Sequence, residues 1–435
     1  MSRLNDFSEL STSDFLTAAA TFGTPIYLYD EQYIADKCRA LLDMPNAYGI
    51  SVRYAMKANS NKSILRLIHS LGLKLDASSL NEAKRAVLAG IPHEDILLTA
   101  QEMPIGDRKE DLQSMMLAGM RYNVCSLRQL HSIGDFAAAQ GLPLSIRVHP
   151  GIGSGESAAR VTGDNYSCFG VHLSDLPQAL DYVAQKGIVF ERVHAHIGSG
   201  TDPDVWSTYV DLILNILETH FPDAHTINFG GGFKEARIPG EKRADIRMVG
   251  ELTRRRVEES YAKTGRKLRV EFEPGTFVIA NAGYIVTQVV DKKRTGDTGL
   301  NFLIVSGSMN INARPLLYGS QHPFYVIGAD GRLQSSEFES DISRHGFQAV
   351  IVGTCCESGD SQCLNATGTN TPRPMAEPEV SDLVVIGGAG AYCSSMTPMN
   401  YNSHLQVPEI LRTKDGDLQL IRRKQTLEQL LANEV

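Results

Sequence analysis

Lys57 is the residue whose position first points to covalent chemistry. It ends an apolar, strand-like run in the segment Tyr54-Ala-Met-Lys57-Ala-Asn59. Lysine is almost never fully buried unless it is paired, so one interpretation is a rim side chain that keeps its ammonium in water. The other is a Schiff-base lysine, whose amine must be partly desolvated beside an aldehyde group. The segment alone leaves both interpretations open.

Two glycine-rich segments follow further strand-like runs, at residues 194–200 and 228–233. Small residues let backbone N–H groups approach an anion such as phosphate. A run such as Gly230-Gly231-Gly232 also occurs in ordinary turns, so each segment alone is weak evidence. The two together favour an anion site more strongly than either does.

An acid, Glu273, follows another strand-like run and is fixed by the next two residues, Pro274 and Gly275. A carboxylate in this place is suited to hold a pyridinium N–H, which keeps the ring protonated so that it withdraws electrons. The alternative is a rim carboxylate in an ion pair. His196, in the first glycine-rich segment, is either a site residue or an ordinary buried histidine.

Polar residues that could take part in binding or catalysis also occur in turn-like contexts of the last third of the chain. None is diagnostic alone, and together they suit the lid of a polar pocket. They are Arg314, Tyr318, Cys356, Glu357 and Tyr392.

The elements that must position these residues alternate between strand and helix. Helical spacing follows most of the strand-like runs, for example after Asp202-Pro203, where an acid N-cap precedes Pro at the first helical position. Eight strands, each paired with a helix, predict a (β/α)₈ barrel of about 250 residues, with its active site at the carboxyl ends of the strands. The runs are 51–55, 73–77, 95–99, 122–126, 144–148, 192–197, 226–229 and 268–272.

After about residue 280 the pattern becomes β-rich with little helical period, as at 284–290, 302–305, 349–352 and 383–386. The expected fold class is therefore α/β, with a TIM-type barrel followed by a β-sandwich or barrel-like domain. We predict a barrel over residues 30–280. Residues 1–29 and 281–435 are predicted to form the mostly β domain, although the sequence does not settle where the first 25 or so residues belong.

Composition excludes several classes of protein. The net charge of −8, from 42 Lys and Arg against 50 Asp and Glu, argues against nucleic-acid binding. No apolar run reaches the roughly 20 residues that cross a bilayer, and the polar amino terminus is unlike a signal peptide. We expect a cytoplasmic protein without membrane partners. The seven cysteines include no CxxC pair, so we expect free thiols and no metal site.

Taken together and in order, these segments resemble the fold-type III pyridoxal-phosphate-dependent decarboxylases. The resemblance implies an alanine racemase-like fold, pyridoxal 5′-phosphate as cofactor and an amino acid as substrate. The activity it implies is decarboxylation of meso-2,6-diaminoheptanedioate to L-lysine. The segments are TPIYLYD (24–30), YAMKANSN (54–61), LDASSLNEAKRAVLAG (75–90), RVHPGIG (147–153), HAHIGSG (194–200), NFGGGF (228–233), EFEPGTFVIANAG (271–283), RPLLYG (314–319), CCESGD (355–360), GAYCSSM (390–396) and NYNS (400–403).

The resemblance also implies a role for each matching residue. Lys57 binds the cofactor covalently, Glu273 contacts the pyridine nitrogen and His196 stacks on the ring. Asp76 and Glu82 support the Schiff-base region. The phosphate is held by Ser199, Gly230, Gly231 and Gly232, with a hydroxyl from Tyr392.

For the substrate, the resemblance implies a homodimer whose sites are shared across the interface. Arg314 and Tyr318 clamp the distal end of the substrate, Glu357 binds its distal ammonium, and Tyr392 also contacts the substrate. Cys356 and Glu357 come from the other subunit. Cys356 is a candidate proton donor to the decarboxylated substrate carbon, and Lys57 is the other candidate.

Three positions depart from the family pattern. Thr276 stands where an Arg is usual, and it removes a cation from the phosphate and substrate region; His149 and Cys168 are lesser departures. The loss of this Arg leaves an alternative function, a related decarboxylase that acts on another amino acid, such as ornithine, a D-amino acid or a siderophore or antibiotic precursor. An alanine-racemase-like enzyme and a non-catalytic pyridoxal-phosphate carrier are further alternatives. Glu273 and the segment 355–360 argue against the racemase, and the β domain argues against the carrier.

Overall fold

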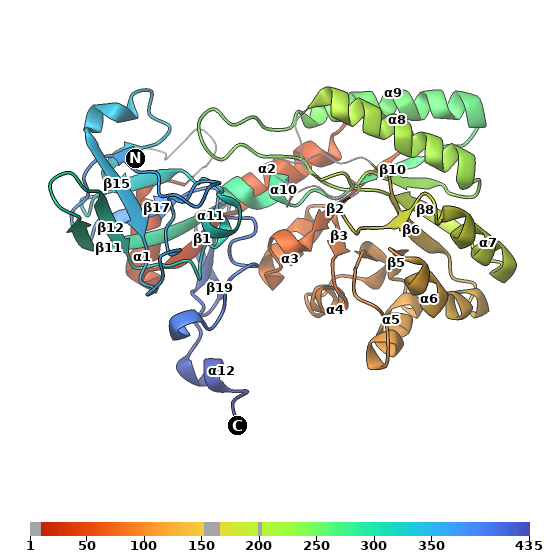
Figure 1. Ribbon diagram of the computed structural model, residues 1–435, viewed down its shortest axis with the longest axis horizontal. Coiled ribbons are helices and arrows are strands. Elements are labelled where there is room, and N and C mark those ends of the chain that lie inside the picture. The colour runs from red at the N-terminus through yellow and green to blue at the C-terminus, as the bar shows by residue number, and fades with distance from the viewer. Residues whose placement is uncertain (1–9, 152–165, 199–201) are drawn as a thin grey trace. The chain divides into compact units, whose positions relative to one another are not determined.

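The computed structural model describes residues 10–151, 166–198 and 202–435. The chain forms two compact units, shown with their elements in Figure 1. The unit that we call the barrel comprises Lys37–Lys234 and Lys242–Val278. The unit that we call the β domain comprises the described part of Met1–Asp36, together with Glu235–Glu241 and Ile279–Val435.

In the described part of the barrel, eight parallel strands form a closed sheet, which confirms the predicted fold class. The order around it is β2-β3-β4-β5-β6-β8-β9-β10, and β10 pairs with β2. A two-residue strand, β7 (Val171–His172), also pairs with β6 and was not predicted. The eight strands are β2 (Ile50–Ala55), β3 (Lys74–Ala77), β4 (Ile96–Leu98), β5 (Arg121–Val124), β6 (Leu144–His149), β8 (Phe190–His194), β9 (Thr226–Asn228) and β10 (Arg269–Phe272).

Helices alternate with these strands, and their starts follow from local sequence. The predicted start at Asp202 is confirmed, since its side chain accepts from the N–H of Asp204 and Pro203 opens the helix. Ser79 caps α4 in the same way by accepting from the N–H of Glu82. The helices along this part of the chain are α2 (Glu31–Leu42), η1 (Met56–Ala58), α3 (Lys62–Ser70), α4 (Leu80–Leu88), η2 (His93–Asp95), α5 (Asp107–Leu117), α6 (Leu127–Ala139), α7 (Leu176–Lys186), α8 (Pro203–His220), α9 (Ile246–Thr264), α10 (Thr276–Ile279) and η4 (Ala280–Ala282).

The β domain is a mixed sheet that has ten strands within the described residues, in the order β14-β13-β17-β11-β1-β18-β19, with β12, β15 and β16 branching from β11. The four predicted β-rich runs lie in β11, β12, β15 and β17. The strands are β1 (Ile26–Asp30), β11 (Gly283–Arg294), β12 (Asn301–Val305), β13 (Phe324–Ile327), β14 (Leu333–Ser336), β15 (Phe347–Val352), β16 (Arg373–Met375), β17 (Leu383–Ile386), β18 (Glu409–Arg412) and β19 (Leu418–Arg422).

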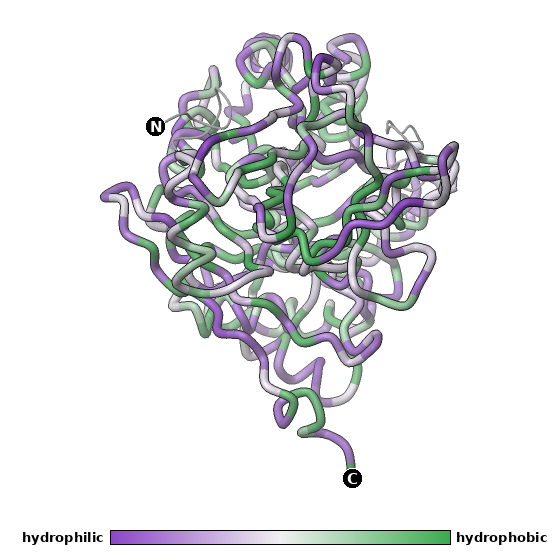
Figure 2. The backbone as a smooth tube through the Cα atoms, turned by 90° about the vertical axis from the view of Figure 1, so that its left-hand side faces the viewer, coloured by the Kyte–Doolittle hydropathy of each residue, from purple (hydrophilic) through white to green (hydrophobic). Residues whose placement is uncertain are grey.

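The segment that precedes the barrel in the chain belongs to this sheet. Strand β1 pairs antiparallel with β11 and parallel with β18, and Phe15 packs edge-on against Tyr284 at 5.2 Å between ring centroids. Figure 2 shows green hydrophobic stretches inside and purple hydrophilic stretches along many outer turns.

The helices of the β domain are α1 (Thr12–Phe22), α11 (Arg314–Tyr318), η5 (Ile342–His345), η6 (Tyr401–Ser403) and α12 (Leu427–Leu431).

The segment 235–241 lies inside the range predicted as barrel but groups with the β domain. Hydrogen bonds explain this grouping: Arg237 Nε donates to the carbonyl of Gly388, and Asn281 Nδ2 donates to the carbonyl of Ala236. Across the described ranges, no helix is both long and apolar enough to cross a membrane.

Candidate active site

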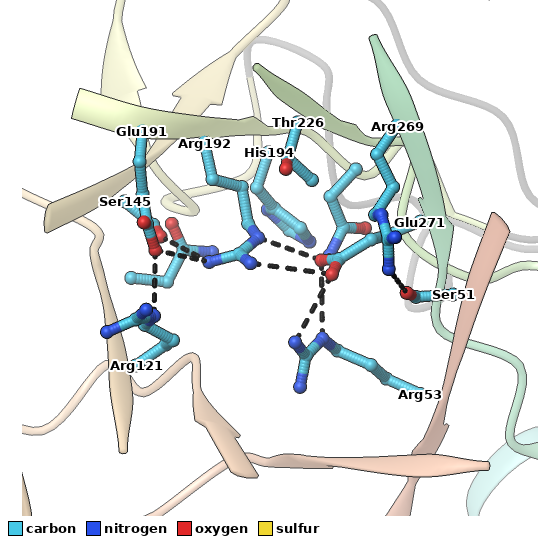
Figure 3. Close-up of polar contacts among 12 residues, drawn as sticks. Ser51, Arg53, Arg121, Ser145, Glu191, Arg192, His194, Thr226, Arg269 and Glu271 are labelled. Atoms are coloured by element: carbon cyan, nitrogen blue, oxygen red, sulfur yellow. Dashed lines mark hydrogen bonds and ion pairs between the residues drawn. The ribbon is translucent and has the colours of Figure 1, made fainter. Parts of the chain in front are cut away.

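Charged side chains occupy the inside of the barrel, where branched apolar residues are usual. Figure 3 shows Arg53 and Arg192 pointing at Glu271 from different strands. The Nε atom of Arg53 lies 3.2 Å from Oε2 of Glu271, and the Nε atom of Arg192 lies 2.8 Å from the same oxygen. Burial alone would raise the pKa of Glu271, but the two guanidinium groups hold it below its usual range. Glu271 is therefore an ionised, fixed anion.

This network extends across the neighbouring strands. Nη1 of Arg192 donates to the hydroxyl of Ser145 at 2.9 Å, and Arg121 pairs with Glu191 at 2.9 Å (Figure 3). A buried charge that loses its partner costs several kcal/mol. The network therefore fixes the relative positions of β2, β6, β8 and β10 below the carboxyl ends of the strands.

Glu273 follows β10, two residues beyond Glu271, and is also buried. His194 Nε2 lies 2.9 Å from its Oε2, and Asn228 Nδ2 donates to its Oε1 at 2.7 Å. Burial would raise the pKa of Glu273, but His194 and the amide of Asn228 lower it to about 2. Burial lowers the pKa of His194, so its imidazole is neutral at pH 7 and Nε2 carries the donated hydrogen. Glu273 is an ionised acceptor that can receive a further N–H.

The predicted glycines form a close backbone approach beside this acid. A Cβ atom on Gly231 would lie 2.3 Å from the carbonyl oxygen of Glu273, and one on Gly230 would lie 2.8 Å from Cβ of His196. Gly230 and Gly232 have φ of +68° and +95°, which favour glycine. The N–H of Gly230 donates to Oδ1 of Asn228 at 2.8 Å. The loop is thus anchored to the residue that also contacts Glu273.

Lys57 lies in η1, directly after β2, with an exposed side chain between the buried residues Met56 and Ala58. Burial and the charge of Glu273 raise the pKa of Asp76 well above its usual range, and the charge of Lys57 opposes them. Burial also raises the pKa of Glu82, against the N–H of Ser78 and the charge of Lys57. The barrel therefore brings the predicted Lys57, Glu82 and Glu273 each within electrostatic reach of Asp76.

His196 lies beyond β8 and is partly exposed. Its Nδ1 accepts from the N–H of Gly198 at 2.9 Å. Burial, then the charges of Arg147 and Lys57, lower the pKa of His196 well below its usual value, so its ring is neutral. Ser199, predicted as a phosphate contact, lies outside the described residues.

In the β domain, three predicted substrate and cofactor residues converge. The guanidinium of Arg314 lies 5.9 Å from the ring centroids of both Tyr318 and Tyr392. Arg314 is buried, with 5% of its surface exposed. Such contacts hold a planar cation in a fixed orientation.

Cys356 and Glu357 are exposed in a separate loop of the β domain. The loop is held to the segment 400–403: Asn402 Oδ1 accepts from the N–H of Cys356 at 2.8 Å, and Tyr401 donates to Oε2 of Glu357 at 2.7 Å. The hydrogen bond from Tyr401 is the main reason that the pKa of Glu357 is lowered. Cys355 is partly buried, and its N–H donates to Asp360.

Sequence reasoning assigned no role to His194, Asn228, Arg53, Arg192 or Glu271. The available signal was charge at alternate positions within buried strands, as in Arg192-Val-His194 and Glu271-Phe-Glu273. Alternate residues of a strand share one face. These side chains therefore had to meet inside the barrel.

Comparison with known proteins assigns this arrangement to a family. Residues 33–280 match the family described as pyridoxal-dependent decarboxylase, pyridoxal binding domain. The chain belongs to the pyridoxal-dependent decarboxylases, and its cofactor is pyridoxal 5′-phosphate. The site fits that group: Glu273 is an ionised acceptor, a glycine loop leaves no space for side chains, and the buried Oδ1 of Asp76 has no hydrogen-bond partner among the described residues.

Within this family, the chain is similar to diaminopimelate decarboxylases along nearly its whole length. The chain is 33% identical to the diaminopimelate decarboxylase of Escherichia coli (strain K12) over 434 residues, which covers 98% of each chain. A crystal structure of diaminopimelate decarboxylase superposes with a TM-score of 0.87 at 32% identity, covering 99% of this chain and 98% of that one. The Helicobacter pylori diaminopimelate decarboxylase, complexed with L-lysine, has a TM-score of 0.78 at 25% identity, covering 96% and 98%.

Proposed function

We propose that this protein decarboxylates meso-2,6-diaminoheptanedioate to L-lysine. The observation that carries the proposal is the buried, ionised Glu273 beside a glycine loop, with both Glu273 and Lys57 within electrostatic reach of Asp76. The choice of substrate is supported by similarity over nearly the whole chain to diaminopimelate decarboxylases, one of which holds L-lysine.

The reaction removes CO₂ from an amino acid and leaves negative charge at Cα. Pyridoxal 5′-phosphate, when bound, supplies an electron sink for this charge. Glu273 is ionised and held in place by His194 and Asn228, so it would keep the ring nitrogen of the bound cofactor protonated. Lys57 supplies the amine that attaches the cofactor.

Further residues of the proposed site would orient the cofactor. His196, as a neutral ring, would stack on the cofactor without adding a cation beside its protonated nitrogen. Because the N–H of Gly230 is already donated to Asn228, we assign phosphate binding mainly to Gly231 and Gly232, with Ser199 and the hydroxyl of Tyr392. Asp76, whose pKa is raised by burial, can hold a proton near the amine of Lys57.

The substrate carries an ammonium and a carboxylate at its distal end, so recognition needs one cation and one anion. Arg314, oriented by Tyr318 and Tyr392, supplies the cation, and Glu357, held by Tyr401, supplies the anion. Cys356 is next to Glu357, and its thiol is our first choice for returning a proton to Cα. We propose that Cys356 and Glu357 act in the site of the partner subunit, in a cytoplasmic homodimer.

The substrate preference is tested with the purified protein loaded with pyridoxal phosphate. Release of CO₂ is measured with meso-diaminoheptanedioate, ornithine, lysine and D-amino acids. We expect the highest kcat/KM for meso-diaminoheptanedioate and no release by K57A. Faster turnover of another amino acid would contradict the proposed substrate and would connect Thr276, in place of the usual Arg, with a changed specificity.

A further inference from the structure

Asn228 contacts three parts of the barrel with one amide group. Its Nδ2 donates to Oε1 of Glu273 at 2.7 Å and lies 3.3 Å from Oε2 of Glu271. Its Oδ1 accepts from the N–H of Gly230 at 2.8 Å. The side chain is fully buried at the end of β9. It therefore joins the ion pairs inside the barrel, the proposed ring-nitrogen partner and the glycine loop.

The orientation of this amide is determined by its neighbours. Gly230 presents an N–H, which requires an oxygen, and the two carboxylates require a donor. The reversed amide would place its oxygen against two anions and its NH₂ against an N–H. Asn228 therefore acts as a donor toward Glu273 and as an acceptor toward Gly230.

Glu271, which Asn228 contacts, is held in place by buried ion pairs. Glu271 is clamped by Arg53 and Arg192, and all three side chains are buried. Glu271 lies in β10 and Glu273 follows it two residues later, so these two ionised groups repel each other. Asn228 donates toward both, which offsets this repulsion and fixes one oxygen of Glu273 while His194 fixes the other.

We propose that Asn228 is a positioning residue, which aligns Glu273 with the cofactor ring and holds the glycine loop in register with it. The inference rests on the proposed function, because it takes Glu273 as the partner of the ring nitrogen. Asn228 itself does not react.

Three substitutions of Asn228 distinguish its contact with Glu273 from its contact with Gly230. Asn228→Asp keeps an oxygen for the N–H of Gly230 but replaces the donor toward Glu273 with an anion. Asn228→Ala removes both contacts. Asn228→Ser keeps a small group that donates and accepts, and it is the variant to use if the other two do not fold. Asn46→Asp is the matched control, since Asn46 also accepts from a glycine N–H, that of Gly49, and donates to a carbonyl rather than to a carboxylate.

The measurements are the pH dependence of the visible absorbance of the cofactor-loaded protein, the dissociation constant of pyridoxal phosphate, and kcat and KM. Thermal unfolding of the cofactor-free protein checks folding. For N228D we expect kcat to fall about 10- to 100-fold, as for loss of a hydrogen bond to a charged group. We also expect a shifted absorbance titration and little change in KM. N228A should bind the cofactor more weakly than N228D, because it loses both contacts. The kcat of N228S should lie between those of wild type and N228D, and N46D should match wild type in all these measurements.

Glu273→Gln is measured beside them. If E273Q loses activity while N228D folds and keeps the wild-type kcat and absorbance titration, the positioning role is wrong and the proposed function stands. If E273Q itself keeps wild-type kcat, the proposed role of Glu273 is wrong, and the inference about Asn228 fails with it.

Discussion

Arg192 and Glu271 form a salt bridge inside the barrel, with Nε of Arg192 2.8 Å from Oε2 of Glu271. Because Arg53 binds the same carboxylate, removing Glu271 leaves two guanidinium groups buried without their anion. We expect Glu271→Gln to lower the free energy of unfolding by about 3–5 kcal/mol. Urea unfolding followed by circular dichroism measures this loss.

The control is Glu258→Gln, which breaks an exposed pair with Arg254 on α9. Such pairs contribute about 0.3–0.5 kcal/mol. Equal losses for E271Q and E258Q would show that the buried network does not stabilise the barrel.

Gly231→Ala tests the glycine loop. The added Cβ would lie 2.3 Å from the carbonyl oxygen of Glu273, so the loop must move away from the acid. We expect pyridoxal phosphate to bind at least about 10-fold more weakly, equivalent to about 1.4 kcal/mol. Equilibrium dialysis measures the dissociation constant. Gly265→Ala is the control: its φ of +69° adds a backbone cost that Gly231 does not have, but its Cβ meets open space, and its cofactor affinity should be unchanged.

His322 predicts a pH dependence of stability. It is fully buried in the β domain, where Nδ1 lies 2.9 Å from the carbonyl oxygen of Gly387. Burial, then the charges of Arg314 and Arg237, lower its pKa well below 6.5. The unfolded chain therefore binds a proton below about pH 6.5 that the folded chain does not. Stability is complete above that pH and falls as the pH is lowered.

His322→Asn, which can place an amide donor near the same carbonyl, removes this titration. We expect the free energy of unfolding of the wild type to fall more steeply between pH 7 and 5 than that of H322N. Parallel curves for the two proteins would contradict the assignment.

Tyr401→Phe tests the holding of Glu357. It removes the hydroxyl that donates to Oε2 of Glu357 and leaves the ring in place. If Glu357 binds the distal ammonium, KM for meso-diaminoheptanedioate should rise several-fold while kcat changes little. Tyr261→Phe, on the outer helix α9, is the control. A fall in kcat with unchanged KM would place Tyr401 in the chemical step instead.

The sharing of sites between subunits has its own test. In equimolar mixtures of K57A and C356A chains, a mixed dimer holds one site with both Lys57 and Cys356 if the two come from different subunits. Activity should then recover to about one quarter of wild type, because half of the dimers are mixed and each has one complete site. No recovery in mixtures shown to exchange subunits would place both residues in the same chain's site.

Much of this architecture could be predicted from sequence because its signals are local. Each of the eight barrel strands overlaps a short β-branched or apolar run, and Asp202-Pro203 marks the start of α8 within two residues. The two-residue strand β7 has too few residues for a pattern, and it forms through pairing with β6.

The site could be predicted only in part. Lys57 and Glu273 closely follow β2 and β10, and the site of such a barrel is expected at the carboxyl ends of its strands. The roles of His194 and Asn228 depend on partners 79 and 45 residues away in the chain. Their importance follows from closure of the barrel, which no short segment encodes. The grouping of 235–241 with the β domain has the same origin, since Arg237 is bound by Gly388, 151 residues later.

The most direct test is product analysis with meso-2,6-diaminoheptanedioate as the sole substrate. The cofactor-loaded wild type should release one CO₂ for each L-lysine formed, while K57A releases none and E273Q is slowed by at least about 100-fold, as for loss of a charge-assisted contact in the reacting state. Full activity in E273Q, or conversion of the substrate without release of CO₂, would contradict the account of Glu273 and of the reaction.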